Sequence, residues 1–205
     1  MKTAKRILES ELTQFELHYT NALKSKVPLL SLIMKYLIRQ KGKKMRPMFV
    51  FLSAKLNGSV QESTYRAATL VEILHTATLV HDDVVDRAST RRGFFSINQL
   101  WKSKGAVLVG DYLLAKGLLL ATENNDFEML RLLSHAVRKM SEGELLQLEK
   151  SRKLNLDEAT YYEIVRNKTA SLLASACAIG AHSVNASASI IEKMTQFGEN
   201  AGIAF

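Results

Sequence analysis

Apolar residues at helical spacing run through almost the whole chain of 205 residues, and only two prolines, Pro28 and Pro47, interrupt it. Leu, Ala, Lys and Glu dominate the sequence, and these residue types favour the α-helix. No segment alternates between apolar and polar residues for long enough to predict a strand. Because proline fits the first turn of a helix, both prolines are expected near helix starts. The sequence therefore predicts an all-α protein.

Short breaks divide this pattern into separate helices. Gly42 ends one of them, and the turn Asn57–Ser59 ends another. The sequence contains no repeat, low-complexity tract or linker, so residues 1–205 are expected to form a single domain. Helices are expected over residues 2–25, 29–40, 48–56, 61–86, 96–102, 106–124, 127–150, 157–182 and 187–205.

The last residues, Phe197–Phe205, stop inside an apolar helical pattern, without a helix cap or a polar tail. Native chain ends usually fray into polar residues. We therefore expect the chain as printed to be cut short, with a naturally short protein as the alternative.

The chain carries a formal charge of +8, from 28 Lys and Arg residues against 20 Asp and Glu residues. Such a balance suits nucleic acid, an anionic membrane surface or phosphorylated small molecules, although scattered lysines also serve solubility alone. Cys177 is the only cysteine, so no internal disulfide is possible, and its small neighbours predict a buried thiol. The most apolar stretch, residues 106–121, contains Asp111 and Lys116 and so predicts a buried helix rather than a membrane span. We expect a cytoplasmic protein without nucleic acid and without stable membrane insertion.

The acidic segment His81–Asp86 is the strongest candidate for a functional site. On a helix, Asp82 and Asp86 lie one turn apart on one face, with Asp83 beside them. The preceding residues are apolar, so these carboxylates end a core helix, where they repel by roughly a few kcal/mol at intermediate dielectric. Mg²⁺ would relieve this repulsion, since it takes one or two carboxylates together with waters and phosphate oxygens. A helix end with solvated acids fits this motif equally well.

A basic loop, Lys41–Pro47, is the second candidate. Gly42 and Pro47 fix a bend between two helices, where basic side chains and free N–H groups of the next helix can converge on an anion. Arg46 offers a two-pronged grip on phosphate, and the lysines offer point charges. Solvated lysines and contact with nucleic acid are the alternatives, but few aromatic residues lie among these charges, which argues against nucleic acid.

Three weaker signals lie elsewhere in the chain. The segment Arg91–Gly93 follows Asp86 by five residues, and its cations either pair with the acids or face anionic ligands beside a metal. The pair Lys168–Thr169 lies within a long helix and on its own indicates a surface position. His75 lies two turns before Asp82 on the same stripe, where a histidine is more often a core residue than a ligand.

Together these segments resemble the trans-polyprenyl diphosphate synthases, all-helical enzymes that lengthen an allylic diphosphate with isopentenyl diphosphate. Residues 42–47 match the family's Gly-Lys-x-x-Arg-Pro, and residues 72–86 match its first aspartate-rich helix almost throughout. Residues 91–93, 109–113 and 168–170 match in the expected order. The resemblance covers nearly the whole chain. It implies a single-domain bundle of antiparallel helices around a deep central cavity, acting as a homodimer.

The resemblance also implies a role for each matching residue. The residues expected to bind Mg²⁺ on the allylic diphosphate are Asp82 and Asp86, supported by Asp83. Those expected to grip the allylic diphosphate itself are Arg91, Lys168 and Thr169. Those expected to hold isopentenyl diphosphate are Lys43, Arg46, His75 and Arg92. Glu144 and Gln147 match polar positions of the pocket.

The chain departs from the family in two places. Lys41 stands where the family usually has a second glycine, and the second aspartate-rich motif, expected after Phe205, is absent. We therefore expect the chain as printed to make little or no product. The rival interpretations are a terpene cyclase, a non-catalytic subunit of a heteromeric synthase, and a purely structural bundle. The three cations Lys43, Arg46 and Arg92 argue against the cyclase, and the complete acidic motif argues against the non-catalytic subunit.

Product length is expected to depend on residues that precede Asp82 on its helix. Thr78 lies one turn deeper, about 5.4 Å, and Ala77 is its neighbour. The family threads its growing product past these positions, and both side chains are small here, with Leu74 the first bulky aliphatic further down. The resemblance therefore implies a long product, of the octaprenyl or heptaprenyl type. A farnesyl or geranylgeranyl synthase is the alternative, and so is an Ala77 that only packs against another helix.

Overall fold

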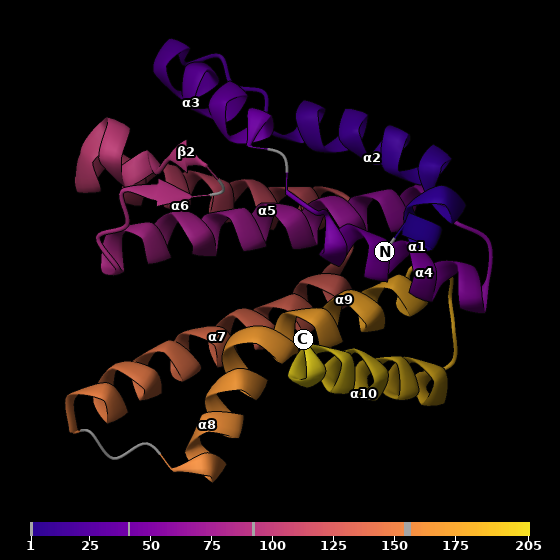
Figure 1. Ribbon diagram of the computed structural model, residues 1–205. Coiled ribbons are helices and arrows are strands. Elements are labelled where there is room, and N and C mark those ends of the chain that lie inside the picture. Colours follow the sequence, from indigo (N-terminus) through magenta and orange to yellow (C-terminus); the bar gives the residue numbers. More distant parts are fainter. Residues whose placement is uncertain (1, 41, 92, 154–156) are drawn as a thin grey trace.

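The computed structural model is helical almost throughout the residues that it describes, which are 2–40, 42–91, 93–153 and 157–205 (Figure 1). This confirms the predicted all-α class. The elements are α1 Lys2–Ile7, α2 Glu9–Ala22, α3 Pro28–Arg39, α4 Met45–Asn57, α5 Glu62–Val85, β1 Thr90–Arg91, β2 Phe94–Phe95, α6 Ile97–Glu123, α7 Phe127–Lys153, α8 Glu158–Val165, a π-helical turn Arg166–Ala170, α9 Ser171–His182 and α10 Ala188–Ala204.

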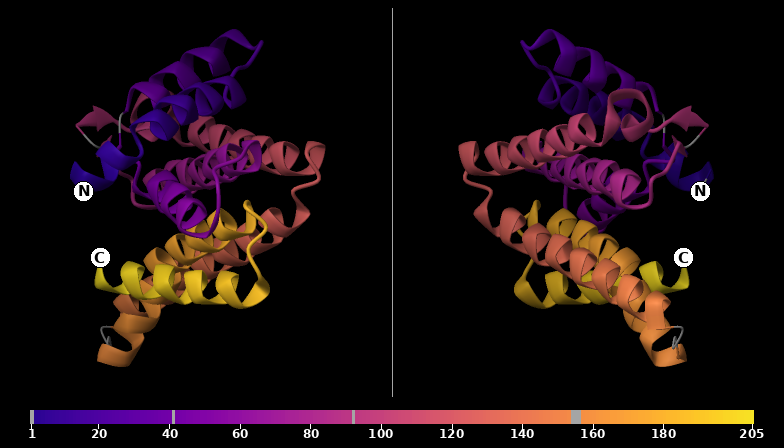
Figure 2. Two further views of the ribbon diagram at one scale, coloured as in Figure 1. Left: turned by 90° about the vertical axis from the view of Figure 1, so that its right-hand side faces the viewer. Right: turned by 90° about the vertical axis from the view of Figure 1, so that its left-hand side faces the viewer.

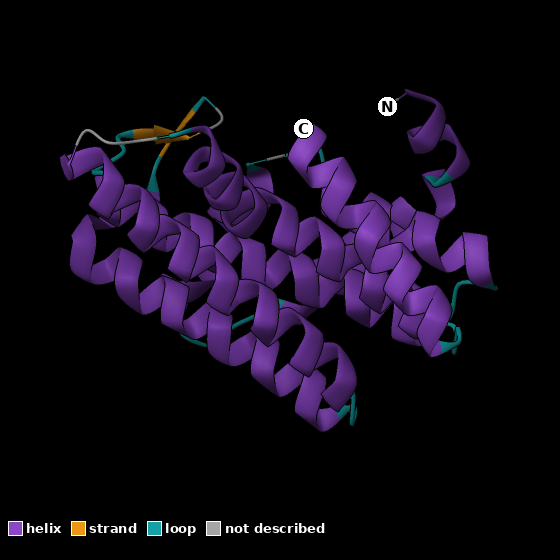
Figure 3. Cartoon of the chain, turned by 90° about the horizontal axis from the view of Figure 1, so that it is seen from below, coloured by secondary structure: helices purple, strands orange, loops and turns teal. Residues whose placement is uncertain are grey.

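The helices form two stacked groups around a shared core. Figure 1 shows α2, α3, α5 and α6 above, and α7, α8, α9 and α10 below; the side views of Figure 2 show the same division. Helix α4 joins the groups, because it packs against both α5 and α9. Seen from below, the long helices run roughly alongside one another, with the β1–β2 hairpin at one end (Figure 3).

Helix α5 is the central element of the upper group. Its N-terminus is capped by Thr64, whose Oγ1 accepts a hydrogen bond of 3.1 Å from the Gln61 backbone N–H. This bond satisfies a backbone donor at the point where the chain enters the helix. From Ala67 to His75 every side chain of α5 is buried, so the helix is enclosed on all sides before it reaches its acidic end.

Three elements differ from the predicted ones. Leu8, which is fully buried, separates α1 from α2 with φ −108° and ψ 18°, so the expected helix over residues 2–25 is wrong at this point. A hairpin of two-residue strands links α5 to α6, and strands this short leave no alternation to detect. The expected helix over residues 157–182 is interrupted by the π-helical turn Arg166–Ala170.

Helix α6 combines the two helices that were expected between residues 96 and 124. Lys102 interrupts it, with φ 62° and ψ 167°. In the described part of the chain, α6 alone is long and apolar enough to cross a membrane, but it packs along α5. The expectation of a buried helix is only partly right, because Leu108 is 61% exposed.

Glycines allow close contacts between helices, both between the two groups and within the upper one. A Cβ atom on Gly180 of α9 would lie 2.3 Å from the carbonyl oxygen of Val50 on α4. A Cβ atom on Gly117 of α6 would instead lie 3.0 Å from Cδ2 of Leu74, the mobile end of a side chain. The α4–α9 contact at Gly180 therefore excludes any side chain, whereas the α5–α6 contact at Gly117 has room to adjust.

We expect Gly180→Ala to lower the free energy of unfolding by about 2 kcal/mol, because overpacking a core costs roughly 1–3 kcal/mol. Gly117→Ala is the matched control. It should be close to neutral, because the flexible Leu74 side chain can move and alanine favours the helix. Urea denaturation of both variants measures the difference. Equal losses of stability would contradict this account of the α4–α9 contact.

Candidate active site

The acidic end of α5 points toward charged groups of α7 and the π-helical turn. Asp82 is partly buried, and burial raises the pKa of its carboxyl. Repulsion from Glu144 and Asp86 raises this pKa further, while Lys168 and Arg91 oppose the shift. Asp82 therefore lies in the electrostatic field of charged side chains on α7 and the π-helical turn, near the residues with which the matching motifs grouped it.

Asp83 has a different environment from Asp82. Its side chain is 3% exposed, and Oδ1 accepts a hydrogen bond of 2.6 Å from Nε of Arg91. Burial raises the pKa of Asp83, and the Arg91 guanidinium opposes that shift. The Asp83 backbone oxygen also accepts bonds from Ala88 N–H and from the Asn98 side chain. Asp83 thus anchors the loop and the hairpin after α5.

Within the described residues, no group of three or more His, Cys, Asp or Glu side chains converges as a ready-made metal site. Asp82 and Asp86 nevertheless supply two carboxylates one helical turn apart. Mg²⁺ accepts one or two carboxylates and takes its remaining ligands from water and phosphate. The residues present therefore fit a magnesium ion that arrives with a phosphorylated ligand.

The basic loop joins α3 to α4 and carries its cations on two sides. Lys43 is exposed. Nη1 of Arg46 lies 2.8 Å from Nε2 of His75 on α5. Because a guanidinium only donates hydrogen bonds, Nε2 of His75 is the acceptor. The predicted partners Arg46 and His75 are therefore brought together.

Lys44 turns away from that pair and was not singled out by its sequence. It caps α4 in a left-handed conformation, with φ 52° and ψ 37°. Its ammonium pairs with Glu16 of α2 and lies 5.7 Å from the ring centre of Phe15. Burial lowers the pKa of Lys44, and the nearby Glu72 opposes that shift. The signal that could have found this cluster is Glu72 itself, an acid within an apolar helix.

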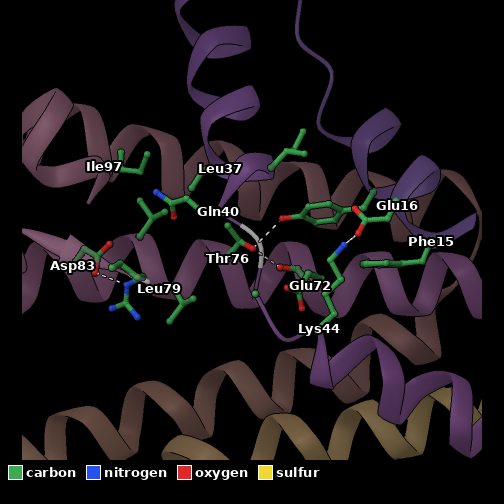
Figure 4. Close-up of a pocket in the computed structure, with 15 residues that line it drawn as sticks. Phe15, Glu16, Leu37, Gln40, Lys44, Glu72, Thr76, Leu79, Asp83 and Ile97 are labelled. Carbon is green, nitrogen blue, oxygen red and sulfur yellow. Dashed lines mark hydrogen bonds and ion pairs between the residues drawn. The ribbon is translucent and has the colours of Figure 1, made fainter. Parts of the chain in front are cut away.

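Lys44 and Asp83 line the same small cavity of about 50 Å³ between α2, α3 and α5. Figure 4 shows Asp83 at one end of this cavity and Lys44, Glu16 and Glu72 at the other. In the middle, Thr76 shares a hydrogen bond of 3.0 Å with the hydroxyl of Tyr19. The second aspartate of the motif thus belongs to the polar interior between the helices.

A larger cavity, of about 380 Å³, lies on the other side of the basic loop. It is lined from three parts of the chain: the loop, the middle of α5, and the π-helical turn with the helices around it. The lining residues are Gly42, Lys43, Lys44, Met45, Arg46, Glu72, His75, Thr169, Leu173 and Phe205. The structure therefore places Thr169 beside Lys43, Arg46 and His75, although the sequence implied separate diphosphate sites for them.

The π-helical turn positions Lys168. Its ammonium lies 2.5 Å from Oε2 of Glu144 and 3.2 Å from Oε1 of Gln147, both on α7. A π-helical turn is rare and frequently marks a functional site. The sequence pointed to Lys168, Glu144 and Gln147 but not to the widened turn, which has no compositional signature here.

Two glycines enclose the π-helical turn. A Cβ atom on Gly143 of α7 would lie 2.9 Å from Cβ of Asn167, and one on Gly202 of α10 would lie 2.5 Å from Cα of Ala170. Real Cβ atoms do not approach other carbon atoms this closely. Neighbouring helices therefore contact the backbone of the turn directly on two sides.

The residues expected to control product length lie on two faces of α5. Ala77 is fully buried, on the stripe where Leu74 and His81 contact glycines of α6. Thr78 is partly exposed, and its hydroxyl donates a bond of 2.9 Å to the backbone oxygen of His75. Ala77 therefore packs toward α6, while Thr78 shares the stripe of Asp82. Two other positions to which the sequence pointed, Arg92 and Lys41, lie outside the described residues.

Comparison with known proteins identifies relatives of this chain. The sequence profile described as polyprenyl synthetase matches residues 27–205. The chain is 39% identical over 179 residues to decaprenyl-diphosphate synthase of Dictyostelium discoideum, covering 87% of this chain and 39% of that protein. It is 31% identical to component 2 of heptaprenyl diphosphate synthase from Geobacillus stearothermophilus, covering 100% of this chain and 64% of that protein.

Solved structures agree with these sequence relatives. A polyprenyl synthase from Caulobacter crescentus, complexed with calcium and isoprenyl diphosphate, superposes with a TM-score of 0.92 at 37% identity, covering 97% of this chain and 61% of that one. A decaprenyl diphosphate synthase from Rhodobacter capsulatus superposes with a TM-score of 0.94 at 33% identity, covering 99% and 63%. The chain spans between 39% and 65% of the curated relatives named first among its matches.

We expect Arg91→Ala to lower the free energy of unfolding by about 1–3 kcal/mol at neutral pH. Breaking a buried pair costs roughly 3–5 kcal/mol, and the 28% exposure of Arg91 reduces that figure. Without Arg91 the folded-state pKa of Asp83 rises further, which favours the protonated folded form. The cost should therefore shrink as the pH falls through that raised pKa.

Urea denaturation in metal-free buffer at neutral and acidic pH measures this effect. Arg131→Ala is the control, because Arg131 pairs with Glu128 on an exposed face of α7. Its removal should change stability little at either pH. A cost for Arg91→Ala that stays constant or grows toward acidic pH would contradict the proposed anchoring role of Asp83.

Proposed function

Because the chain belongs to the polyprenyl synthetase family, we propose that it condenses isopentenyl diphosphate with an allylic diphosphate, giving a long-chain trans-polyprenyl diphosphate. The observation that carries this proposal is the pairing of the acidic end of α5 with cations on both sides of it. Lys168 and Arg91 lie near Asp82, and Arg46 lies near His75, two turns deeper along α5. Such a condensation requires binding sites for two diphosphate groups and one face that binds a metal ion.

The allylic diphosphate would be held at the acidic end of α5. Asp82 and Asp86 would bind Mg²⁺ together with the diphosphate oxygens, and Mg²⁺ would supply charge that stabilises the departing pyrophosphate. Lys168 would add a point charge, fixed by Glu144 and Gln147. These groups favour the transition state over the ground state, because negative charge grows on the leaving group as the C–O bond breaks.

Arg91 is oriented for the same task. Its Nε donates to Asp83, and in the described residues its terminal nitrogens make no hydrogen bond to the protein. Asp83 therefore holds the planar guanidinium through its Nε, and the two terminal nitrogens can donate hydrogen bonds to a phosphate. We assign Asp83 to orienting Arg91, and Asp82 and Asp86 to the metal.

Isopentenyl diphosphate would bind in the cavity of about 380 Å³. Lys43 and Arg46 supply positive charge, and His75 fixes the orientation of Arg46. Thr169 and the apolar Leu173 line the same cavity, so the isopentenyl group would lie near the end of the π-helical turn. An apolar wall protects a carbocation from water, which would otherwise quench it. Pyrophosphate is the base that we propose for the final proton loss.

A long product is supported by the relatives and by the small side chains on α5. Matching proteins are named decaprenyl, heptaprenyl and nonaprenyl diphosphate synthases. Thr78 lies on the stripe of Asp82, where a growing chain would pass. Other matching proteins are named geranylgeranyl diphosphate synthases, so a shorter product is the second candidate.

We also propose a dimer formed through the outer face of α6. This face exposes Val107, Leu108, Leu118 and Leu119, interspersed with Lys104, Asp111 and Lys116. Apolar side chains with both signs of charge suit a self-complementary interface. A different chain is the alternative partner, because one relative is named as component 2 of its synthase.

The central test is incubation of the intact enzyme, rather than the chain as printed, with farnesyl diphosphate, an excess of isopentenyl diphosphate and Mg²⁺, followed by sizing of the products. We expect products longer than geranylgeranyl diphosphate, and shorter ones from Thr78→Phe, because a ring would narrow the path of the chain. Ala77→Phe should shorten the product less and destabilise the fold more, since Ala77 faces α6. Binding of both diphosphates without any condensation would favour the non-catalytic subunit, and products that end at geranylgeranyl diphosphate would contradict the assigned length.

We expect Arg46→Ala to weaken binding of isopentenyl diphosphate at least about tenfold and to leave farnesyl diphosphate almost unaffected, with the reverse for Lys168→Ala. A hydrogen bond to a charged group is worth about 1.5–3 kcal/mol, and about 1.4 kcal/mol is tenfold in affinity. Calorimetric titration in the presence of Mg²⁺ measures both affinities. Lys139→Ala, an exposed lysine of α7, is the control. Equal losses for both ligands in both variants would argue against two separate diphosphate sites.

A further inference from the structure

One long segment of the chain is exclusively basic. Between Glu16 and Glu62 there is no Asp or Glu, while nine Lys and Arg residues occur. Lys43, Lys44 and Arg46 line the cavities described above, and Lys55 of α4 pairs with Glu11 of α2. Four further cations lie on α3 or in the connection that enters it, and they have no role in the proposed chemistry.

Helix α3 places exposed aliphatic side chains among those remaining cations. Val27, Leu29 and Leu32 are 58%, 57% and 58% exposed, although Ile33 and Met34 on the opposite side are buried. Four exposed cations flank them: Lys24, Lys26, Lys35 and Arg39. We call these three aliphatic residues and four cations the α3 face. Figures 1 and 2 show that α3 lies at the outer edge of the molecule.

The spacing of these residues produces one continuous surface. Leu29 and Leu32 are three positions apart, and Lys35 follows three positions later, so they share one side of the helix. Arg39 continues that side at the next turn. Lys24 and Lys26 lie in the connection that enters the helix beside Val27. Apolar side chains therefore lie at the centre of the face, and long basic side chains lie at both ends.

A second copy of this chain would not suit the α3 face. A symmetric interface would bring the same cations together, and like charges facing one another are unfavourable. The mixed charges of α6 suit self-association better. Single-stranded nucleic acid would need aromatic residues for base stacking, and the face exposes only aliphatic ones.

We propose that the α3 face docks the protein peripherally on an anionic lipid bilayer. The aliphatic side chains would enter the boundary between headgroups and acyl chains, and the lysines would extend toward the anionic headgroups. Stable attachment of this kind needs both an apolar and an electrostatic contribution, and the face supplies both. Helix α3 leads directly into Gly42, which lines both cavities, so the docked bilayer lies beside the basic loop. The proposal does not depend on the chemistry proposed above.

Flotation with lipid vesicles tests this docking. We expect the protein to bind vesicles of phosphatidylcholine mixed with phosphatidylglycerol and not vesicles of phosphatidylcholine alone. Binding should fall as salt is added, because the surface charges are screened. The double variant Leu29→Ser/Leu32→Ser should partition at least about tenfold more weakly. Replacing Lys24, Lys26 and Lys35 by Gln should weaken partitioning by about fivefold for each lysine removed.

Matched variants elsewhere on the surface serve as controls. Leu56→Ser/Leu145→Ser removes two aliphatic side chains that are 73% and 67% exposed. Replacing the exposed Lys5, Lys139 and Lys193 by Gln removes the same charge as the α3 triple variant. Both control variants should bind mixed vesicles like the unchanged protein, and thermal unfolding should show that all four variants are folded.

Three results would overturn the proposal. The first is equal binding to neutral and anionic vesicles, and the second is an equal loss of binding in the α3 variants and their controls. The third is a change in oligomeric state, measured by light scattering, for Leu29→Ser/Leu32→Ser without any vesicle binding by the unchanged protein. That third result would make the α3 face an interface between copies.

Discussion

The structure depends on how α5 carries charge through the core. This helix is enclosed by other helices, yet it bears Glu72 and His75 within its buried length and three aspartates at its end. Charge removed from water is costly unless a partner compensates it. Here the compensating cations come from different elements: Arg91 of the hairpin pairs with Asp83, while Lys44 at the start of α4 lies in the field of Glu72 and Lys168 of the π-helical turn in that of Asp82. The demand for compensation on one helix thus determines where three other segments must lie.

This arrangement also explains why neighbouring aspartates have different surroundings. Successive residues of a helix point about 100° apart, so Asp83 cannot share the surroundings of Asp82. Asp82 lies among the groups of α7, whereas Asp83 lies in the polar interior beside α2 and α3. A run of acids therefore reaches two compartments, one that suits a ligand and one that orients an arginine. Cys177 is buried without any such partner; burial raises the pKa of its thiol to about 12, and it behaves as a small apolar side chain, as predicted.

The sequence predicted most of the helices, and it pointed to pairs of candidate site residues, because both depend on local spacing. Asp82 and Asp86, or Glu144 and Gln147, share a face through helix geometry alone. The break at Leu8, the π-helical turn and the partners of Lys44 depend instead on tertiary packing, which leaves no periodic signal. The cavity shared by Thr169 and His75 joins residues 94 positions apart in the chain, and only the fold brings them together. The family resemblance implied the roles, while the structure supplied the contacts of Asp83 with Arg91 and of His75 with Arg46.

The π-helical turn contains one residue more than an α-helical turn, since the Ser171 N–H donates to the carbonyl oxygen of Arg166 five positions earlier. Beyond it, every residue from Ser171 to Ala181 is buried. Helix α9 therefore has no exposed side that could tolerate a change in its rotation. Loss of a single codon between positions 166 and 170 would therefore act as a rotation of α9 by about 100° rather than as a shortening. Glycines that now face neighbouring backbones would be replaced by side chains at the same contacts. The length of this segment is therefore fixed by the packing of the helix that follows it.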